Sequence, residues 1–204
     1  LAVLGEFNLS NCLAVWTVLL AQGLSPSEAS ERMSKLSAVP GRMELIHLSK
    51  TQRTEGPLIV VDYAHTPDAL TKALNALRPI ANQRNGKVWC VFGCGGDRDS
   101  GKRPQMGRAA QELADHIVIT SDNPRSENPD SIIAMIQAGM SGDLSNVQAL
   151  PDRAAAIMAA VRHADTKDIV LVAGKGHEST QEISGKKFDF SDQEHIRLAA
   201  GGSV

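Results

Sequence analysis

The chain has 204 residues, a net charge of −2 and 42% hydrophobic residues. This composition is typical of a globular protein with one large core and part of a second. The few aromatic residues and the near-neutral charge argue against a nucleic-acid partner. No stretch reaches the ~20 apolar residues of a membrane span, and the start LAVLGEFNLS lacks the basic region of a signal peptide. We therefore expect a cytoplasmic protein without a membrane span.

The chain has three cysteines, Cys12, Cys90 and Cys94. Their number is odd and no two form a C-x-x-C pair, so neither a zinc cluster nor a disulfide framework is expected. We predict buried, free thiols.

The first 40 residues are predicted to be helical. Ser10 or Asn11 can cap an apolar helix over Cys12–Ala21, and Gly23 suits the position just after its end.

A second helix follows in SPSEASERMSKL. Here Ser25 is the predicted N-cap, Pro26 takes the first helical position, and Glu28 completes a capping box. Pro40 and Gly41 then end the helical pattern, and a strand-like segment follows. We place a domain boundary near Gly41. Because the chain begins without Met, residues 1–40 are expected to be part of a domain that starts upstream.

From residue 57 onward, apolar strand-like runs alternate with amphipathic helical runs, which indicates βαβ units around a mostly parallel sheet. The predicted strands are 57–62, 87–92, 116–120, a short one near Val147, and 168–173. The predicted helices are 67–80, 104–114, 129–140 and 152–163. QEISGKKFDF then predicts a hairpin that turns near Gly185, and SDQEHIRLAA predicts a final helix.

Ligands of an open α/β sheet bind beyond the carboxyl ends of its strands. The segments that directly follow four of the predicted strands are DYAHTPD (62–68), GCGGDRDSGKRP (93–104), SDNPR (121–125) and GKGHE (174–178). All four are rich in glycine or ionisable residues. We expect them to meet at one edge of the sheet and to form a binding site.

The glycine-rich loop 93–104 matches neither of two phosphate-binding motifs completely. A dinucleotide fingerprint would need glycine at Arg98, and a P-loop would need Ser or Thr at Arg103. In addition, Asp97 and Asp99 would repel phosphate.

GKGHESTQ is likewise no zinc-protease motif, because Gln181 replaces the second histidine. His65 either begins a helix capped by Thr66 or Asp68, or belongs to the site. His47, His116, His163 and His195 are expected to be structural or solvated.

Three charged residues of these loops suggest the kind of ligand. The guanidinium groups of Arg98 and Arg125 can bind carboxylates in a bidentate manner, and Glu178 can bind an ammonium group. This combination suits an amino-acid zwitterion better than a nucleotide alone.

Six segments, FNLSN, PGRME, VDYAHTPDAL, FGCGGDRDSGKRPQMG, SDNPRSENP and VAGKGHE, occur in this order. Together they resemble the Mur ligases of peptidoglycan synthesis, from about Gly5 to the hairpin near Phe190. YAHTPDAL and GCGGDRD are the most specific of them. The resemblance is strongest to the members that add 2,6-diaminopimelate.

The family has a domain for the UDP-muramoyl substrate, a central P-loop ATPase domain and a C-terminal Rossmann-like domain that binds the incoming amino acid. By resemblance, residues 1–40 are the end of the central domain, and residues 41–204 are the α/β C-terminal domain with its mostly parallel sheet and hairpin. The family uses ATP and Mg²⁺ to phosphorylate UDP-N-acetylmuramoyl-L-alanyl-D-glutamate on its D-glutamate carboxylate. The amine of meso-diaminopimelate then attacks that acyl phosphate.

The resemblance also implies roles for individual residues. DNPR is the form found where diaminopimelate is the substrate, and its arginine has a second carboxylate to bind, which lysine lacks. The residues that match diaminopimelate contacts are Arg98, Asp122, Asn123, Pro124, Arg125, Gly174 and Glu178. The residues that match nucleotide-binding positions are Asn8 and Asn11 beside the adenine, Arg42 near the phosphates, Asp62 at the ribose, and Tyr63 and His65 in the same motif.

The family's Walker A loop, Mg²⁺ ligands and modified catalytic lysine have no match in residues 1–204. We therefore expect no catalytic residue and no metal ligand here, and a fragment that needs its upstream domains for ligation. One alternative is a stand-alone module that binds amino acid or nucleotide without catalysis, and the half-domain at 1–40 argues against it. Another is an NAD-dependent oxidoreductase, which the failed fingerprint weakens.

Overall fold

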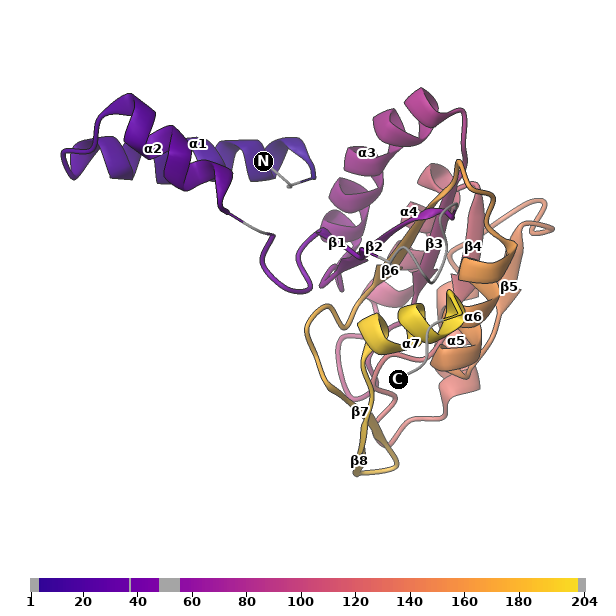
Figure 1. The fold of residues 1–204 in the computed structure, drawn as a ribbon. Coiled ribbons are helices and arrows are strands. Elements are labelled where there is room, and N and C mark those ends of the chain that lie inside the picture. The colour runs from indigo at the N-terminus through magenta and orange to yellow at the C-terminus, as the bar shows by residue number, and fades with distance from the viewer. Residues whose placement is uncertain (1–3, 37, 48–55, 202–204) are drawn as a thin grey trace.

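The computed structural model describes residues 4–36, 38–47 and 56–201. Its centre is a six-stranded sheet with the strand order β1-β2-β6-β3-β4-β5, in which only β1 runs antiparallel to its neighbour (Figure 1). The strands are β1 (Glu44–Leu45), β2 (Leu58–Asp62), β3 (Val88–Phe92), β4 (His116–Ile119), β5 (Val147–Ala149) and β6 (Ile169–Ala173). The predicted α/β fold with a mostly parallel sheet is confirmed.

Helices cover both faces of this sheet because successive strand residues point to opposite sides. Val60 belongs to the hydrophobic core on one face and Val61 to the core on the other. The first core is completed by α3 (Pro67–Arg84), α4 (Lys102–Leu113) and α5 (Pro129–Gln137), and the second by α6 (Arg153–His163) and α7 (Asp192–Ala199). A sheet buried on both faces explains the nearly continuous apolar runs of its strands.

The predicted hairpin is present as β7 (Thr180–Ile183) and β8 (Lys186–Asp189), which pair antiparallel and turn at Ser184 and Gly185. It projects beyond the sheet domain before α7 returns to it (Figure 1).

The two N-terminal helices are α1 (Glu6–Ala21) and α2 (Pro26–Ser34). The capping box of α2 at Ser25 and Glu28 is confirmed, and Gly23 follows α1 with a positive φ of 91°, as predicted. The predicted cap of the first helix at Ser10 or Asn11 is wrong, because the helix starts at Glu6 with Gly5 as its N-cap. No glycine or proline interrupts residues 6–11, so the helix extends back to Gly5.

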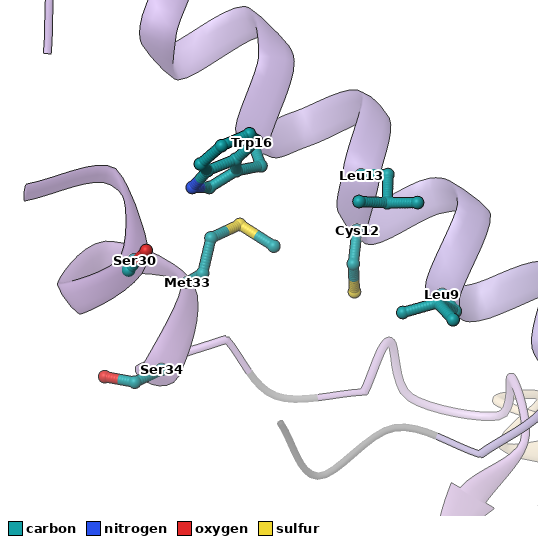
Figure 2. Close-up of a pocket in the computed structure, with 7 residues that line it drawn as sticks. All are labelled: Leu9, Cys12, Leu13, Trp16, Ser30, Met33 and Ser34. Atoms are coloured by element: carbon teal, nitrogen blue, oxygen red, sulfur yellow. The ribbon is translucent and has the colours of Figure 1, made fainter. Parts of the chain in front are cut away.

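Helix α1 leaves large apolar side chains exposed. It packs on α2 around Cys12 and Met33, beside a surface pocket of about 370 Å³ that also includes Trp16 (Figure 2). Leu9 is 55% exposed and Leu13 57% exposed. A helix that is apolar on most of its surface normally packs against more protein than α2 alone.

Two further helices differ from prediction at their C-terminal ends. Helix α3 continues past the half-buried Ile80 to Arg84 and closes on Asn85, whose left-handed backbone (φ 53°) ends it. Helix α5 ends at Gln137, three residues before the predicted Met140.

All three cysteines are free and buried, as predicted. Burial raises the pKa of Cys94 to about 12, so it is an inert thiol at neutral pH. Among the described helices, none is both long and apolar enough to cross a membrane.

Candidate functional site

Loops that follow β2, β3, β4 and β6 meet at the carboxyl edge of the sheet, as the sequence predicted. They enclose a pocket of about 420 Å³, a size typical of small-molecule sites. The pocket is lined by Tyr63, His65, Gly95, Arg98, Asp99, Lys102, Asp122, Asn123, Arg125, Gly174 and Glu178. It therefore unites both predicted arginines with the predicted carboxylate of Glu178.

The loops after β3 and β4 lie backbone against backbone. Gly96 N donates a hydrogen bond to Asn123 O at 2.9 Å, and a Cβ atom at Gly96 would overlap Pro124 O. Only glycine permits this approach. Pro124 itself is buried and does not line the pocket, so its place in the structure is to support the loop.

Arg125 lies at the junction of three segments. Its Nη1 donates to Gly96 O at 2.7 Å, and its Nε lies 3.5 Å from Glu182 Oε2 on β7. Its backbone has a φ of 52°, a left-handed conformation that non-glycine residues rarely adopt. Such strain is common at functional sites, where surrounding contacts hold it in place.

Asn123 and Glu178 form a hydrogen-bonded polar wall of the pocket. Asn123 Nδ2 donates to Glu178 Oε2 at 2.9 Å. Partial burial acts to raise the pKa of Glu178, but hydrogen bonds from Asn123 and Lys175 outweigh it, and the pKa is lowered. Glu178 is therefore a carboxylate at neutral pH and can accept an ammonium group.

Asp122 is almost completely buried beside this wall. Burial raises the pKa of its carboxyl group, although Arg153 and Lys175 act in the opposite direction. Its Oδ1 has no hydrogen-bond partner among the described residues and lies 3.7 Å from Lys175 Nζ.

Arg98 and Lys102 also line the pocket. Arg98 is exposed and makes no hydrogen bond or ion pair with any described residue, so its guanidinium is available to a ligand. Lys102 donates to His65 O at 2.7 Å. Of the two predicted caps, Thr66 and not Asp68 caps α3.

Of the residues assigned to the nucleotide by resemblance, Tyr63 and His65 line the pocket, whereas Arg42 and Asp62 do not. The ring of Tyr63 packs against His65 at a centroid distance of 4.7 Å, and the guanidinium of Arg42 lies 4.8 Å from the Tyr63 ring centroid. The carboxylate of Asp62 instead accepts hydrogen bonds from the backbone of Met43 (2.7 Å) and Ala64 (2.8 Å). In the described structure, Asp62 thus connects the segment before β1, at Met43, to the loop after β2, at Ala64.

Asn8 and Asn11 do not line the pocket. Both lie on α1, where Asn8 Nδ2 donates to Leu4 O at 2.7 Å and Asn11 Nδ2 lies 3.5 Å from Asn8 Oδ1.

Arg103 and Lys175 are buried cations near the pocket, and the sequence did not predict their burial. Arg103 takes the position where a P-loop would have a hydroxyl residue. Its side chain is 1% exposed. Both of its terminal nitrogens donate to the Glu127 carboxylate at 2.7 Å. This inward structural role is further reason to reject a P-loop. Lys175 is fully buried behind the pocket. Local sequence gave no signal for either, because burial of a long cation depends on distant partners.

No group of three or more His, Cys, Asp or Glu side chains in the described part of the chain is arranged to hold a metal ion. Arg42 and Tyr63 offer a nucleotide one cation and one aromatic ring, which fits part of such a ligand.

Comparison with known proteins agrees with this fold. The family model for the Mur ligase glutamate ligase domain matches residues 41–176. A UDP-N-acetylmuramoyl-L-alanyl-D-glutamate–2,6-diaminopimelate ligase of Ralstonia nicotianae is 58% identical over 97% of this chain, which spans 37% of that relative. A solved structure of a ligase with the same name is 40% identical, with a TM-score of 0.74 over 98% of this chain and 39% of that one.

A more distant structure shares the fold alone. It is a bifunctional folylpolyglutamate synthase/dihydrofolate synthase of Yersinia pestis, complexed with AMPPNP and Mn ion. It is 24% identical, with a TM-score of 0.53 over 79% of this chain and 35% of that one. The family match covers more than half of the sequence and coincides with the sheet domain that carries the pocket. The chain belongs to the Mur ligase family.

Proposed function

We propose that this chain is part of an ATP-dependent ligase that joins meso-2,6-diaminopimelate to UDP-N-acetylmuramoyl-L-alanyl-D-glutamate, and that its described pocket binds the amino acid. The observation that carries the proposal is that one pocket is lined by two guanidinium groups, of Arg98 and Arg125, and by the carboxylate of Glu178. The names of the relatives support the choice of substrate.

Diaminopimelate carries two carboxylates and two ammonium groups, so it requires more than one charged contact. The guanidinium of Arg98 has no described partner and would bind one carboxylate. Arg125 would bind near the other end of the ligand, because Gly96 O and Glu182 hold its side chain in place. The Glu178 carboxylate would accept an ammonium group and so orient the chain of the ligand.

The pocket residues would bind and orient the amino acid while the chemistry occurs at the other substrate. Transfer of the ATP γ-phosphoryl group to the D-glutamate carboxylate gives an acyl phosphate and ADP. The deprotonated amine then attacks the acyl carbon, the amide bond forms, and phosphate leaves. The contribution of the described pocket would be to hold the attacking nitrogen in line with that carbon.

Residues 1–40 are proposed to be the end of the ATP-binding domain, with a boundary near Gly41. The chain spans well under half of the relatives it matches, and the exposed Leu9 and Leu13 of α1 are suited to pack against the rest of such a domain. Arg42 and Tyr63 would then face a nucleotide bound between the two domains. Ligation would require the complete polypeptide, with any Mg²⁺ held mainly by its other residues.

The proposal is tested with the complete polypeptide in an assay that measures release of phosphate and formation of the amide product. Product should require ATP, the UDP-muramoyl dipeptide and diaminopimelate together, and omission of any one should abolish it. Product without diaminopimelate, or no product with all three, would contradict the proposal. Binding of diaminopimelate without any turnover would instead favour a non-catalytic module.

A further inference from the structure

A lysine lies buried directly behind the pocket. Lys175 follows β6, is 0% exposed, and does not line the pocket. Lysine is almost never fully buried unless it is paired. Its Nζ lies 3.0 Å from Asn123 Oδ1, 3.1 Å from Glu178 Oε2 and 3.7 Å from Asp122 Oδ1. All three of these neighbours line the pocket, so the ammonium group contacts the site from within the protein.

We propose that Lys175 is a positioning residue, whose buried ammonium group fixes the side chains of Asn123 and Glu178 in the orientation that receives the amino acid. The identity of that amino acid depends on the function proposed above, whereas the orientation of the two side chains does not.

The hydrogen bonds of Asn123 show how this positioning works. Its Oδ1 accepts from Lys175 Nζ and from the backbone N–H of Glu182 at 3.0 Å. Its amide can therefore not turn over without placing an NH₂ group against two donors. With Oδ1 fixed in this way, Nδ2 points at Glu178 Oε2. Both Asn123 and Lys175 thus bind the same oxygen of Glu178, and Oε1 is the oxygen available to a ligand.

The charges around Lys175 make its removal costly. Arg153 of α6 is buried and pairs with Asp192 of α7 at 2.8 Å, and it also donates to Ala173 O at 3.0 Å. Lys175 and Arg153 are thus two buried cations near the carboxyl groups of Asp122, Asp192 and the partly buried Glu178. Without Lys175, Arg153 is already paired with Asp192, and Arg125 is the other cation that acts on Glu178. The Glu178 carboxylate would then turn away from Asp122.

The direct test is Lys175→Met in the complete polypeptide, with steady-state kinetics measured below the unfolding temperature. We expect the KM for the amino acid to rise roughly tenfold or more, because buried polar groups lose their partner, while the KM for ATP stays within twofold. Lys167→Met, at an exposed position near the opposite edge of the sheet, serves as the matched control and should leave both values unchanged. An equal rise of both KM values, or no rise, would overturn the proposal.

Two further measurements separate positioning from general stability. If Lys175→Met does not fold, Lys175→Gln keeps a hydrogen-bond donor and should raise the amino-acid KM by less than any variant without one. In a protein that already carries Asn123→Ala, the same Lys175 substitution should raise the amino-acid KM by a clearly smaller factor than it does in the wild type, because the two residues act as a unit. If the effects of the two substitutions on the amino-acid KM are independent, so that their free-energy changes simply add, the proposal is overturned.

A crystal structure of the Lys175 variant tests the positioning without any ligand. The Asn123 amide or the Glu178 carboxylate should be displaced, and unchanged positions of both would overturn the proposal. If the wild type fails to use diaminopimelate, the proposed function is wrong, yet this structural comparison still decides the role of Lys175.

Discussion

Two backbone hydrogen bonds hold Arg125 in its left-handed conformation. Arg125 N donates to Glu182 O at 3.0 Å, and Ser184 N donates to Arg125 O at 2.6 Å. Turn formation alone would be satisfied by Asp122, Asn123 and Pro124, so the sequence already marked the arginine as a residue with another purpose. The structure adds that its backbone is strained and that its guanidinium is held between the loop after β3 and strand β7.

Arg125→Lys tests this residue, because lysine keeps the charge and loses the planar fork. We expect amino-acid binding to weaken by roughly 1–3 kcal/mol, with ATP binding unchanged. Calorimetric titration of the complete polypeptide with the amino acid measures the effect. Arg108→Lys on the exposed side of α4 is the control. Unchanged affinity in the Arg125 variant would remove Arg125 from the site.

A second residue pair links the start of α4 to the loop after Arg125. Hydrogen bonds from Arg103, followed by one from the backbone of Asp97, lower the pKa of Glu127 to about 2 from its ordinary value near 4.5. A lowered pKa stabilises the fold above pH 4.5, and this contribution is lost as the pH falls toward 2.

We therefore expect Glu127→Gln to destabilise this chain by roughly 1–3 kcal/mol at pH 7, because it leaves the buried guanidinium of Arg103 without a charged partner. The difference from wild type should shrink as the pH falls below 4.5. Urea unfolding at several pH values measures it, with the exposed Glu112→Gln as control. A difference that is the same at pH 3 and pH 7 would contradict this account.

At the scale of elements, the spacing of apolar residues predicted most strands and helices, and capping residues predicted some of the helix ends. The alternating strands and helices from Leu58 to Ala173 were predicted because most residues of each strand are apolar. Helix ends were less predictable. Ser10 and Asn11 are good caps in isolation, but nothing before them stops α1 until Gly5. Ion pairs and hydrogen bonds between distant segments, such as those of Arg103 or Lys175, leave no pattern in the local sequence from which they could be predicted.

The β7–β8 hairpin contacts the loop after β4 and holds it in place. Gln181 Nε2 donates to Asp122 O at 2.8 Å, and Glu182 contacts both Asn123 and Arg125. The sequence predicted the hairpin but not this contact, because the two segments are more than 50 residues apart.

Gln181→Ala should therefore loosen the loop without touching the ligand. We expect a loss of roughly 1 kcal/mol in stability and a higher amino-acid KM with an unchanged KM for ATP. Lys186→Ala, at the exposed start of β8, is the control and should change neither quantity. Thermal unfolding and steady-state kinetics measure both, and a wild-type amino-acid KM would show that the hairpin does not position the loop.

At the scale of the whole molecule, the strand order places the four site loops side by side. β2, β6, β3 and β4 are consecutive neighbours in the sheet and all run parallel, so their carboxyl ends share one edge. The helices α1 and α2 extend away from this body (Figure 1). The alternation of strands and helices predicted a parallel sheet. It also predicted that the four loops meet at one edge, and the residues that line the pocket lie in these loops.

The proposed boundary near Gly41 predicts that the sheet domain folds without α1 and α2. A polypeptide of residues 40–204 should keep a single cooperative thermal transition and bind less of an apolar dye than the 204-residue chain, because Leu9 and Leu13 are removed. Circular dichroism and dye fluorescence measure this. A loss of the cooperative transition would place the boundary elsewhere.

The central claim is that the pocket selects an amino acid with two carboxylates. The most direct measurement is kcat/KM of the complete polypeptide for meso-diaminopimelate and for lysine, with the same UDP-muramoyl dipeptide and ATP. Because lysine lacks the second carboxylate, we predict a preference for diaminopimelate of at least about tenfold, which Arg125→Lys should reduce. Equal use of the two amino acids would contradict the account.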